Sequence, residues 1–319
     1  MYSIGIDLGG TNIAGGLVDE QHNIVQKKSV KTRAPRPVEE IAHDIAELCK
    51  DLAKMQGLDI KDVGFAGVAS PGIIRGDIVE TASNLGFYKA PLAKLVSDEI
   101  GIKTYLQNDA NIAAYAEGIL GAGVDCNSLV LVTLGTGVGG GIILNKKIYD
   151  GFNGAGAEIG HIIIENGGNA CGCGNNGCFE AYCSATALIN ATKKAMRKDR
   201  LSQMWNLCDN DIEKVSGKTA FDGMRLNDPT AKLVVNGFIH YLAVGISNII
   251  TLLQPEMVAI GGGLSKEGDY ILKPLLKEIS AFSLLKNDAM TTKVTMAKFE
   301  NDAGILGASL LGYKDFKVL

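Results

Sequence analysis

Hydrophobic and polar positions along the chain follow two patterns. Short apolar runs at residues 4–8, 63–68 and 129–134 are typical of buried β-strands. Over residues 38–55, apolar side chains instead recur every three or four positions, which predicts an amphipathic helix. Because strands and helices alternate in this way along most of the sequence, we expect α/β domains with mixed sheets.

The same patterns predict the remaining elements. Apolar runs predict further strands over residues 23–32, 103–107, 257–260 and 293–297. Helical spacing predicts helices over residues 92–100, 108–120 and 231–253, and a last helix that begins near residue 302.

One strand–turn–strand pattern occurs twice. Residues 8–18 resemble residues 134–144 at an offset of 126 positions. Each copy follows an apolar strand, contains a glycine-rich turn and leads into a second β-rich run. A duplicated pair of similar domains is the simplest explanation, and a cleft between two such domains is a typical ligand site.

Glycine is concentrated in a few places. Of the 40 glycines, 22 lie in residues 1–16, 135–141, 151–177 and 261–263. Glycine-rich turns leave backbone N–H groups free to bind phosphate oxygens. The P-loop motif and the His-Arg-Asp and Asp-Phe-Gly motifs of protein kinases are absent from the sequence.

The second turn matches a dinucleotide-binding pattern only in part. Residues 135–140 read Gly-x-Gly-x-x-Gly, but that fingerprint must open a helix, and the residues that follow are β-forming. A plain hairpin turn is the alternative for either copy alone. Two copies that each carry a threonine, Thr11 and Thr136, favour a pair of turns that bind one nucleotide.

Charge and apolar segments restrict the possible partners. The net charge is −4 and no run of Lys or Arg stands out, so we predict no nucleic-acid partner. The first residues predict a strand rather than a secretory signal. The longest apolar stretch, residues 234–253, contains several polar residues and predicts a buried helix rather than a membrane span. We therefore expect no membrane partner and a cytoplasmic location.

Three of the seven cysteines lie within eight residues. Cys171, Cys173 and Cys178 form the pattern Cys-x-Cys-x₄-Cys, and His161 lies ten residues upstream. In a reducing compartment, clustered cysteines favour metal binding over a disulfide. Three thiolates and one imidazole match a closed, structural Zn²⁺ site with no position left for water. The alternative is four unrelated residues in one loop.

These motifs together resemble a known superfamily. Residues 7–12, 134–141 and 261–263 are similar to the two phosphate motifs and the adenosine motif of the actin/hexokinase/Hsp70 superfamily. The cysteine pattern is similar, at every ligand, to the zinc signature of the ROK family (repressors, open reading frames, sugar kinases). Over its whole length the chain resembles the bacterial glucokinases of that family.

The resemblance implies a fold and a division into domains. It implies two duplicated actin-like ATPase (ribonuclease H-like) domains with an interdomain cleft. The smaller domain is expected at residues 1–118, completed by a C-terminal helix at 303–319, and the larger domain, with the zinc loop, at 119–302.

The resemblance also implies an ATP-dependent hexose kinase. It would transfer the γ-phosphate of ATP to the 6-hydroxyl of glucose, with Asp109 as the general base. The alternative role for Asn108 and Asp109 is helix capping. Asp7 would act near Mg²⁺ through water. The implied nucleotide-binding residues are Asp7, Gly9, Gly10, Thr11, Asn12, Gly135, Thr136, Gly137, Gly262 and Gly263, and the implied sugar-binding residues are Asn84, Asn108, Asp109, Glu158, His161 and Glu180.

One departure leaves the preferred hexose open. Residues 84–87 read Asn-Leu-Gly-Phe, where the related kinases often have Asn-Leu-Pro-Gly-Trp. N-acetylmannosamine, fructose and allose therefore stay as alternatives to glucose. A ROK repressor carries a helix-turn-helix before the first phosphate motif, and because Asp7 is the seventh residue here we expect a kinase rather than a repressor. A chaperone-like nucleotide switch would explain neither the zinc nor the sugar residues. The resemblance further implies a homodimer or homotetramer.

Overall fold

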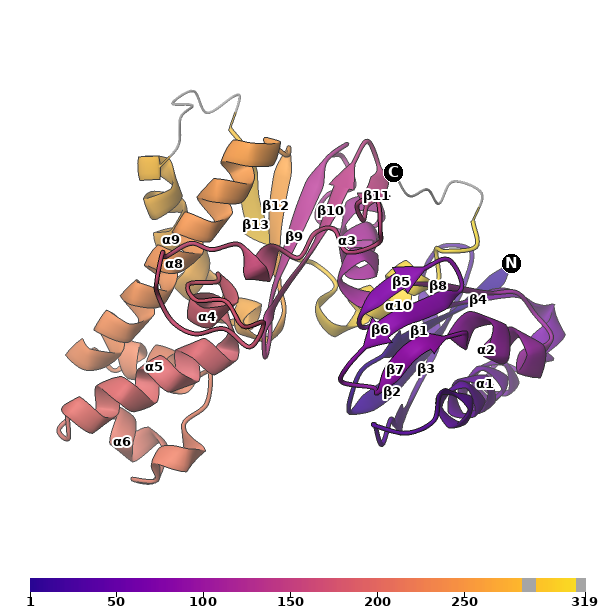
Figure 1. Cartoon of the computed structure of the whole chain (residues 1–319), viewed down its shortest axis with the longest axis horizontal. Coiled ribbons are helices and arrows are strands. Elements are labelled where there is room, and N and C mark those ends of the chain that lie inside the picture. The colour runs from indigo at the N-terminus through magenta and orange to yellow at the C-terminus, as the bar shows by residue number, and fades with distance from the viewer. Residues whose placement is uncertain (283–290, 314–319) are drawn as a thin grey trace. The chain divides into compact units, whose positions relative to one another are not determined.

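The computed structural model describes residues 1–282 and 291–313, which form two compact units (Figure 1). Unit 1 consists of Met1–Ser128, Gly141–Ala157 and the C-terminal segment from Asn301. Unit 2 consists of Leu129–Gly140 and Glu158–Glu300.

A five-stranded sheet forms the centre of unit 1, in the order β3-β2-β1-β4-β8. Strands β1, β2 and β3 pair antiparallel, whereas β4 lies parallel to β1 and β8 lies parallel to β4. The strands are β1 (Tyr2–Leu8), β2 (Asn12–Val18), β3 (Ile24–Lys31), β4 (Val63–Ser70) and β8 (Thr104–Asn108).

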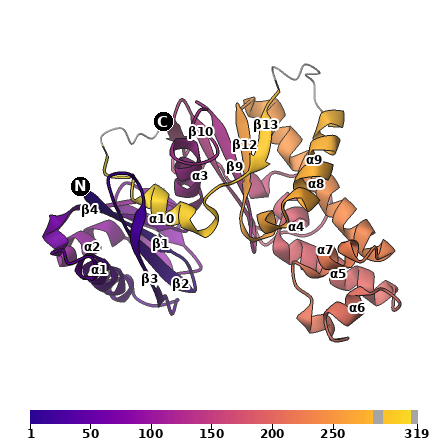
Figure 2. The same ribbon diagram turned by 180° about the vertical axis from the view of Figure 1, so that it is seen from behind.

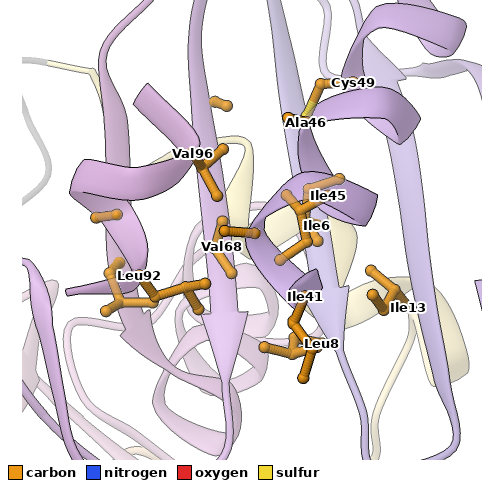
Figure 3. Packing of buried hydrophobic residues seen from close by; sticks show 14 of the residues in the cluster. Ile6, Leu8, Ile13, Ile41, Ile45, Ala46, Cys49, Val68, Leu92 and Val96 are labelled. Carbon is orange, nitrogen blue, oxygen red and sulfur yellow. The ribbon is translucent and has the colours of Figure 1, made fainter. Parts of the chain in front are cut away.

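Helices α1 (Val38–Met55) and α2 (Leu92–Ile100) cover one face of this sheet. Alternate residues of a strand point to opposite faces, and Ile4, Ile6 and Leu8 of β1 all belong to the apolar cluster beneath the two helices (Figure 3). The apolar face predicted for residues 38–55 is thereby buried. This core fixes the position of β1, whose last residues lead into the first glycine-rich turn.

The opposite face of β1 is covered at close range by α10 (Ala303–Ala308) (Figure 2). A Cβ atom at Gly5 would lie 1.9 Å from the carbonyl oxygen of Ile305, so glycine lets the helix backbone rest directly on the strand. The prediction placed a helix over residues 303–319. Helix α10 ends at Ala308, and the described residues 309–313 that follow form turns. Residues 314–319 lie outside the described residues.

A small antiparallel sheet in unit 1 was not predicted. It is formed by β5 (Ile73–Arg75), β6 (Ile78–Ala82) and β7 (Phe87–Ala90). These strands are three to five residues long and half-exposed, so their sequences carry too little alternation to reveal them. The turn between β6 and β7 contains Asn84.

A second five-stranded sheet has the order β11-β10-β9-β12-β13. Strands β9, β12 and β13 are parallel, as are β1, β4 and β8. The repeated strand order confirms the duplication inferred from the two glycine-rich turns. The strands are β9 (Leu129–Leu134), β10 (Val138–Leu144), β11 (Lys147–Tyr149), β12 (Met257–Gly261) and β13 (Lys293–Met296).

The boundary between the units falls within β10, after Gly140. The predicted domain bounds therefore place residues 119–128, 141–157 and 301–302 differently from the compact units. Close packing explains the second segment, because a Cβ at Gly141 would lie 2.5 Å from Cβ of Ala114 in α3 (Asp109–Ile119) of unit 1.

Helix α8 (Pro229–Leu253) is the longest helix of unit 2 and contacts α4, α5, α7 and α9. By length and composition alone it could cross a membrane, and 44% of its most apolar window is buried within the structure. The other helices of this unit are α4 (Glu180–Cys183), α5 (Ala185–Lys198), α6 (Met204–Leu207), α7 (Thr219–Arg225) and α9 (Asp269–Phe282).

Candidate active site

Polar residues gather where the parallel strands of unit 1 end. The strand register places Asp7 of β1 beside Ala69 of β4, and Ala69 beside Gln107 of β8. Because parallel strands end at the same edge of a sheet, this register brings Asp7 to the same edge as Asn108 and Asp109. The carboxyl edge of a parallel sheet is a common ligand site in α/β proteins.

Asn108 is the N-cap of α3. Its Oδ1 accepts hydrogen bonds from the backbone N–H groups of Ala110 (3.0 Å) and Asn111 (3.1 Å). Its Nδ2 donates to the carbonyl oxygen of Gly72 (3.0 Å). The capping role considered from the sequence thus belongs to Asn108. Asp109 is the first residue of the helix, with one carboxyl oxygen held by the N–H of Ala110 (2.8 Å).

Both carboxyl groups at this edge are harder to ionise than usual. Burial raises the pKa of Asp109. The pKa of Asp7 is raised to about 6, chiefly by burial and also by the negative charge of Asp109, while Lys27 opposes both. A buried carboxyl group with a raised pKa can accept a proton near neutral pH.

The first glycine-rich turn, residues 9–11, joins β1 to β2 and is held from behind. The hydroxyl group of Thr32 donates to the carbonyl oxygen of Gly9 (2.6 Å), and the N–H of Thr32 donates to the carbonyl oxygen of Thr11 (3.0 Å). Thr32 is completely buried, whereas Gly10 and Thr11 are exposed. The turn therefore offers its outer surface, with the Thr11 side chain, to a ligand.

Asn84 lies next to this turn. A Cβ built at Gly10 would be 3.6 Å from Nδ2 of Asn84. The structure thus brings one predicted sugar-binding side chain close to the predicted phosphate-binding turn.

The second glycine-rich turn, residues 135–137, is closed by a hydrogen bond from the N–H of Gly135 to the carbonyl oxygen of Gly137 (3.0 Å). The N–H of Ala185 donates to the carbonyl oxygen of Gly135 (2.8 Å). The hydroxyl group of Thr186 donates to the carbonyl oxygen of Thr136 (2.8 Å). This turn is therefore supported by the start of α5.

Glu180 lies beside the same turn. Its Oε2 accepts a hydrogen bond from the N–H of Val138 (3.0 Å). A Cβ at Gly137 would lie only 2.2 Å from that oxygen, so a larger residue there would displace the Glu180 carboxylate. The predicted sugar-binding role of Glu180 stays a prediction, because this contact is with the second turn.

The third glycine-rich segment follows β12. Gly262 has φ of +83°, and a Cβ on it would lie 2.6 Å from the backbone N and O atoms of Leu134. Glycine is required for this approach to the end of β9. Gly263 has no atom within 4 Å of its Cβ position, so the segment leaves open space beside it.

The four predicted zinc ligands come together in unit 2. One ligand atom from each of His161, Cys171, Cys173 and Cys178 lies within 4.8 Å of all the others. Sγ of Cys171 is 3.7 Å from Nδ1 of His161, and the Sγ atoms of Cys173 and Cys178 are 3.6 Å apart. Around a tetrahedral Zn²⁺ with bonds of about 2.3 Å, neighbouring ligand atoms lie about 3.8 Å apart. The cluster fits the ion.

The predicted sugar-binding residues divide between the units. Asn84, Asn108 and Asp109 belong to unit 1, and Glu158, His161 and Glu180 belong to unit 2. Glu158 is exposed and immediately precedes the short helix Ile159–His161. Since His161 faces the cysteines through Nδ1, its Nε2 is the atom left for the predicted sugar contact.

Three residues at the site were missed from the sequence. Thr32 and Thr186 each hold one glycine-rich turn, and Gly304 of α10 lies against Asp7, with its Cβ position 2.8 Å from a carboxyl oxygen. None of the three lies in a recognisable motif. Strand order and the packing of α10 decide these contacts, and single-sequence patterns do not reveal either.

Comparisons with known proteins find similar sequences and structures over nearly the whole chain. The sequence model of the ROK family matches residues 3–314. A glucokinase of Thermotoga maritima is 33% identical over 96% of this chain and 95% of its own length. One of Halalkalibacterium halodurans is 35% identical over 97% and 94%. The crystal structure of a ROK family glucokinase from Streptomyces griseus in complex with glucose and AMPPNP superposes with a TM-score of 0.82 and 32% identity, over 98% of this chain and 99% of that one.

Proposed function

The chain belongs to the ROK family and is an ATP-dependent sugar kinase, and we propose that it phosphorylates the 6-hydroxyl of glucose with Asp109 as general base. The observation that carries this proposal is the position of Asp109, whose half-buried side chain lies at the carboxyl edge of the sheet together with Asp7, near the end of the strand that leads into the first glycine-rich turn. The similarity to named glucokinases over nearly the whole chain supports glucose as the acceptor.

In the proposed reaction Asp109 removes the proton of the acceptor hydroxyl. As the oxygen attacks the γ-phosphorus of ATP, the proton passes to the carboxylate and ADP departs with the bond electrons. The N–H of Ala110 holds one carboxyl oxygen at 2.8 Å and so fixes its orientation. Burial raises the pKa of Asp109, which makes its carboxylate a better proton acceptor.

Phosphate binding would use the two glycine-rich turns. The exposed Thr11 side chain and the backbone N–H groups of residues 9–11 support the assignment of the first turn, and Thr136 occupies the equivalent place in the second. The carboxylate of Asp7 suits Mg²⁺, an ion that prefers oxygen ligands and retains water. Bound Mg²⁺ would neutralise charge on the β- and γ-phosphates. Gly262 and Gly263 would border the adenosine.

Sugar binding would use Asn84 and Asn108 from unit 1 and Glu158, His161 and Glu180 from unit 2. Zn²⁺, held by His161, Cys171, Cys173 and Cys178, would have a structural role because the four ligands complete its coordination.

We also propose a cytoplasmic homodimer or homotetramer. The seven cysteines, all among the described residues, form no disulfide, which fits a reducing compartment. Light scattering would give the subunit number.

An ADP-release assay over a panel of hexoses tests the proposal. Glucose should give the highest kcat/KM, and N-acetylmannosamine, fructose and allose should give lower values. A preference for one of those three would correct the substrate but leave the sugar kinase intact. ADP release that no hexose stimulates would contradict the proposed function.

A further inference from the structure

One short segment, residues 180–186, supports the second glycine-rich turn at Gly135 and Thr136 and at the adjoining Val138. The N–H of Ala185 binds the carbonyl oxygen of Gly135 (2.8 Å), and the Thr186 hydroxyl binds that of Thr136 (2.8 Å). Oε2 of Glu180 accepts a hydrogen bond from the N–H of Val138 (3.0 Å). Residues 180–186 begin two positions after the last cysteine of the cluster.

The Glu180 side chain links the turn with the cluster. Its Oε2 binds Val138, and its Oε1 lies 3.7 Å from Sγ of Cys171. Cys171 in turn lies 3.7 Å from Nδ1 of His161. Because the Cβ position of Gly137 is 2.2 Å from Oε2, the carboxylate fills the space directly beneath the turn.

The backbone that precedes Glu180 is anchored to the loop that carries the metal ligands. The N–H of Phe179 donates to the carbonyl oxygen of Ile162 (2.8 Å), the residue after His161. Ile163 and Cys178 form an isolated β-bridge. Phe179 is completely buried, and its ring lies against Gly245 of α8. The position of Glu180 therefore depends on how the ligand loop is held.

We propose that Glu180 is a positioning residue through which metal binding at the four ligands sets the shape of the second glycine-rich turn. A hydrogen bond to a carboxylate is stronger than one between neutral groups, so Glu180 is the main support of Val138. A metal held by His161 and Cys178 would fix the backbone that joins Ile162 to Phe179, and with it the position of Glu180. Nucleotide affinity then depends on the metal, a consequence that rests on the proposed function of this turn.

Hydrogen exchange tests the structural step without any substrate. In the metal-loaded protein, the Val138 amide should be protected; after chelation, or in Glu180→Ala, it should exchange at least about tenfold faster, which corresponds to about 1.4 kcal/mol. Glu180→Gln keeps an acceptor oxygen and should restore most of the protection. The Val258 amide in β12 of unit 2 and the Thr32 amide in unit 1 are internal references that should not change.

Titration with ADP tests the consequence for binding. Chelation and Glu180→Ala should each weaken ADP binding about tenfold, and chelation of Glu180→Ala should add no further loss. Glu213→Ala removes an exposed glutamate of unit 2 that pairs with Lys193, and this control should bind ADP normally. Metal analysis should confirm that Glu180→Ala still retains the metal.

Three results would overturn the inference: Val138 exchange that does not change on chelation, equal acceleration at Val258, or ADP affinity that is independent of metal. None of these would contradict the kinase activity itself. Conversely, metal-dependent exchange at Val138 in a protein that phosphorylates no hexose would leave the structural link standing and remove the proposed function.

Discussion

The two glycine-rich turns occupy equivalent places in two sheets with the same strand order, yet their supports differ. In unit 1, Thr32 immediately after β3 holds the first turn from within the buried core. In unit 2, Glu180, Ala185 and Thr186 hold the second turn from a segment that follows the cysteine cluster. The first turn is thus held by a residue at the end of a strand of its own sheet, whereas the second turn is held by a segment outside its sheet.

The strand residues before the turns also differ. Asp7 lies near the end of β1, and the position 126 residues later is Thr133 in β9. Unit 1 therefore brings a carboxylate to the edge of its sheet, together with Asp109, and the equivalent strand of unit 2 brings a hydroxyl group. Duplication has preserved the turn, while the charged groups predicted to act on the phosphates are concentrated in unit 1.

The largest effect is expected from Asp109→Asn. Loss of a general base costs about 100- to 10,000-fold in kcat, and the asparagine can still accept the hydrogen bond from Ala110. Steady-state turnover with glucose and calorimetric titration with ADP would measure the two properties separately. Turnover should collapse while ADP affinity stays close to normal.

A matched control is Asp98→Asn, because Asp98 is an exposed aspartate of α2 in unit 1 that pairs with Lys94. It should retain most of the turnover. Near-normal turnover of Asp109→Asn would show that Asp109 is not the general base. It would also contradict the proposal that the catalytic carboxyl groups belong to unit 1.

The pH dependence of stability should reflect Asp7. Its pKa is about 6 in the folded protein against 3.8 as the reference value, because burial and the Asp109 charge disfavour ionisation. The folded protein therefore binds more protons between these values, and the free energy of unfolding should fall by up to about 3 kcal/mol as pH rises through that window. Denaturant unfolding at several pH values would measure this.

Asp7→Asn should lose this contribution, and its stability should fall less between pH 4 and 6. In Asp109→Asn the pKa of Asp7 should decrease, since one repelling charge is gone. Unchanged pH profiles in both variants would show that Asp7 titrates normally and that the two carboxyl groups do not interact.

Gly304→Ala should crowd the side chain of Asp7, which lies near the first glycine-rich turn. The new Cβ would lie 2.8 Å from the Asp7 carboxyl group, and overpacking of this kind costs about 1–3 kcal/mol. Gly237→Ala is the control, because nothing lies within 4 Å of its Cβ position in α8. That variant should gain about 0.5–1 kcal/mol, and thermal unfolding with and without Mg²⁺ and ADP would compare the two. Equal changes in unfolding temperature for the two variants would argue against close packing of α10 on Asp7.

The smallest effects compare the two hydroxyl groups directly. Thr32→Val removes a buried hydrogen bond to Gly9 and should cost about 1 kcal/mol in the free energy of unfolding. Thr186→Val removes an exposed hydrogen bond to Thr136 and should cost less. Denaturant titration of both variants gives the ranking, and the reverse order would mean that the exposed Thr186 hydroxyl contributes more to stability than the buried Thr32 hydroxyl.

The sequence predicted what its local patterns encode. Strands such as β1 and β9 and the amphipathic helix α1 follow from hydrophobic spacing. The zinc ligands could be predicted because three of them lie within eight residues. The repeat predicted two similar sheets because the turn itself was duplicated.

Contacts between distant segments could not be predicted in the same way. Thr32 binds Gly9 across 23 residues, and Glu180 binds Val138 across 42. Gly304 meets Asp7 only because α10 returns to the first sheet. Each of these contacts requires knowledge of the strand order or of the helix packing, and neither leaves a periodic signal in the sequence.

Phosphorus NMR of the product tests the central claim most directly. The protein is incubated with glucose, ATP and Mg²⁺, and the phosphorus–proton couplings of the new phosphate ester identify the carbon that carries it. The account predicts one product with the phosphate on carbon 6, and no such product from Asp109→Asn. Phosphate on another carbon, or ADP formed without any sugar phosphate, would contradict it.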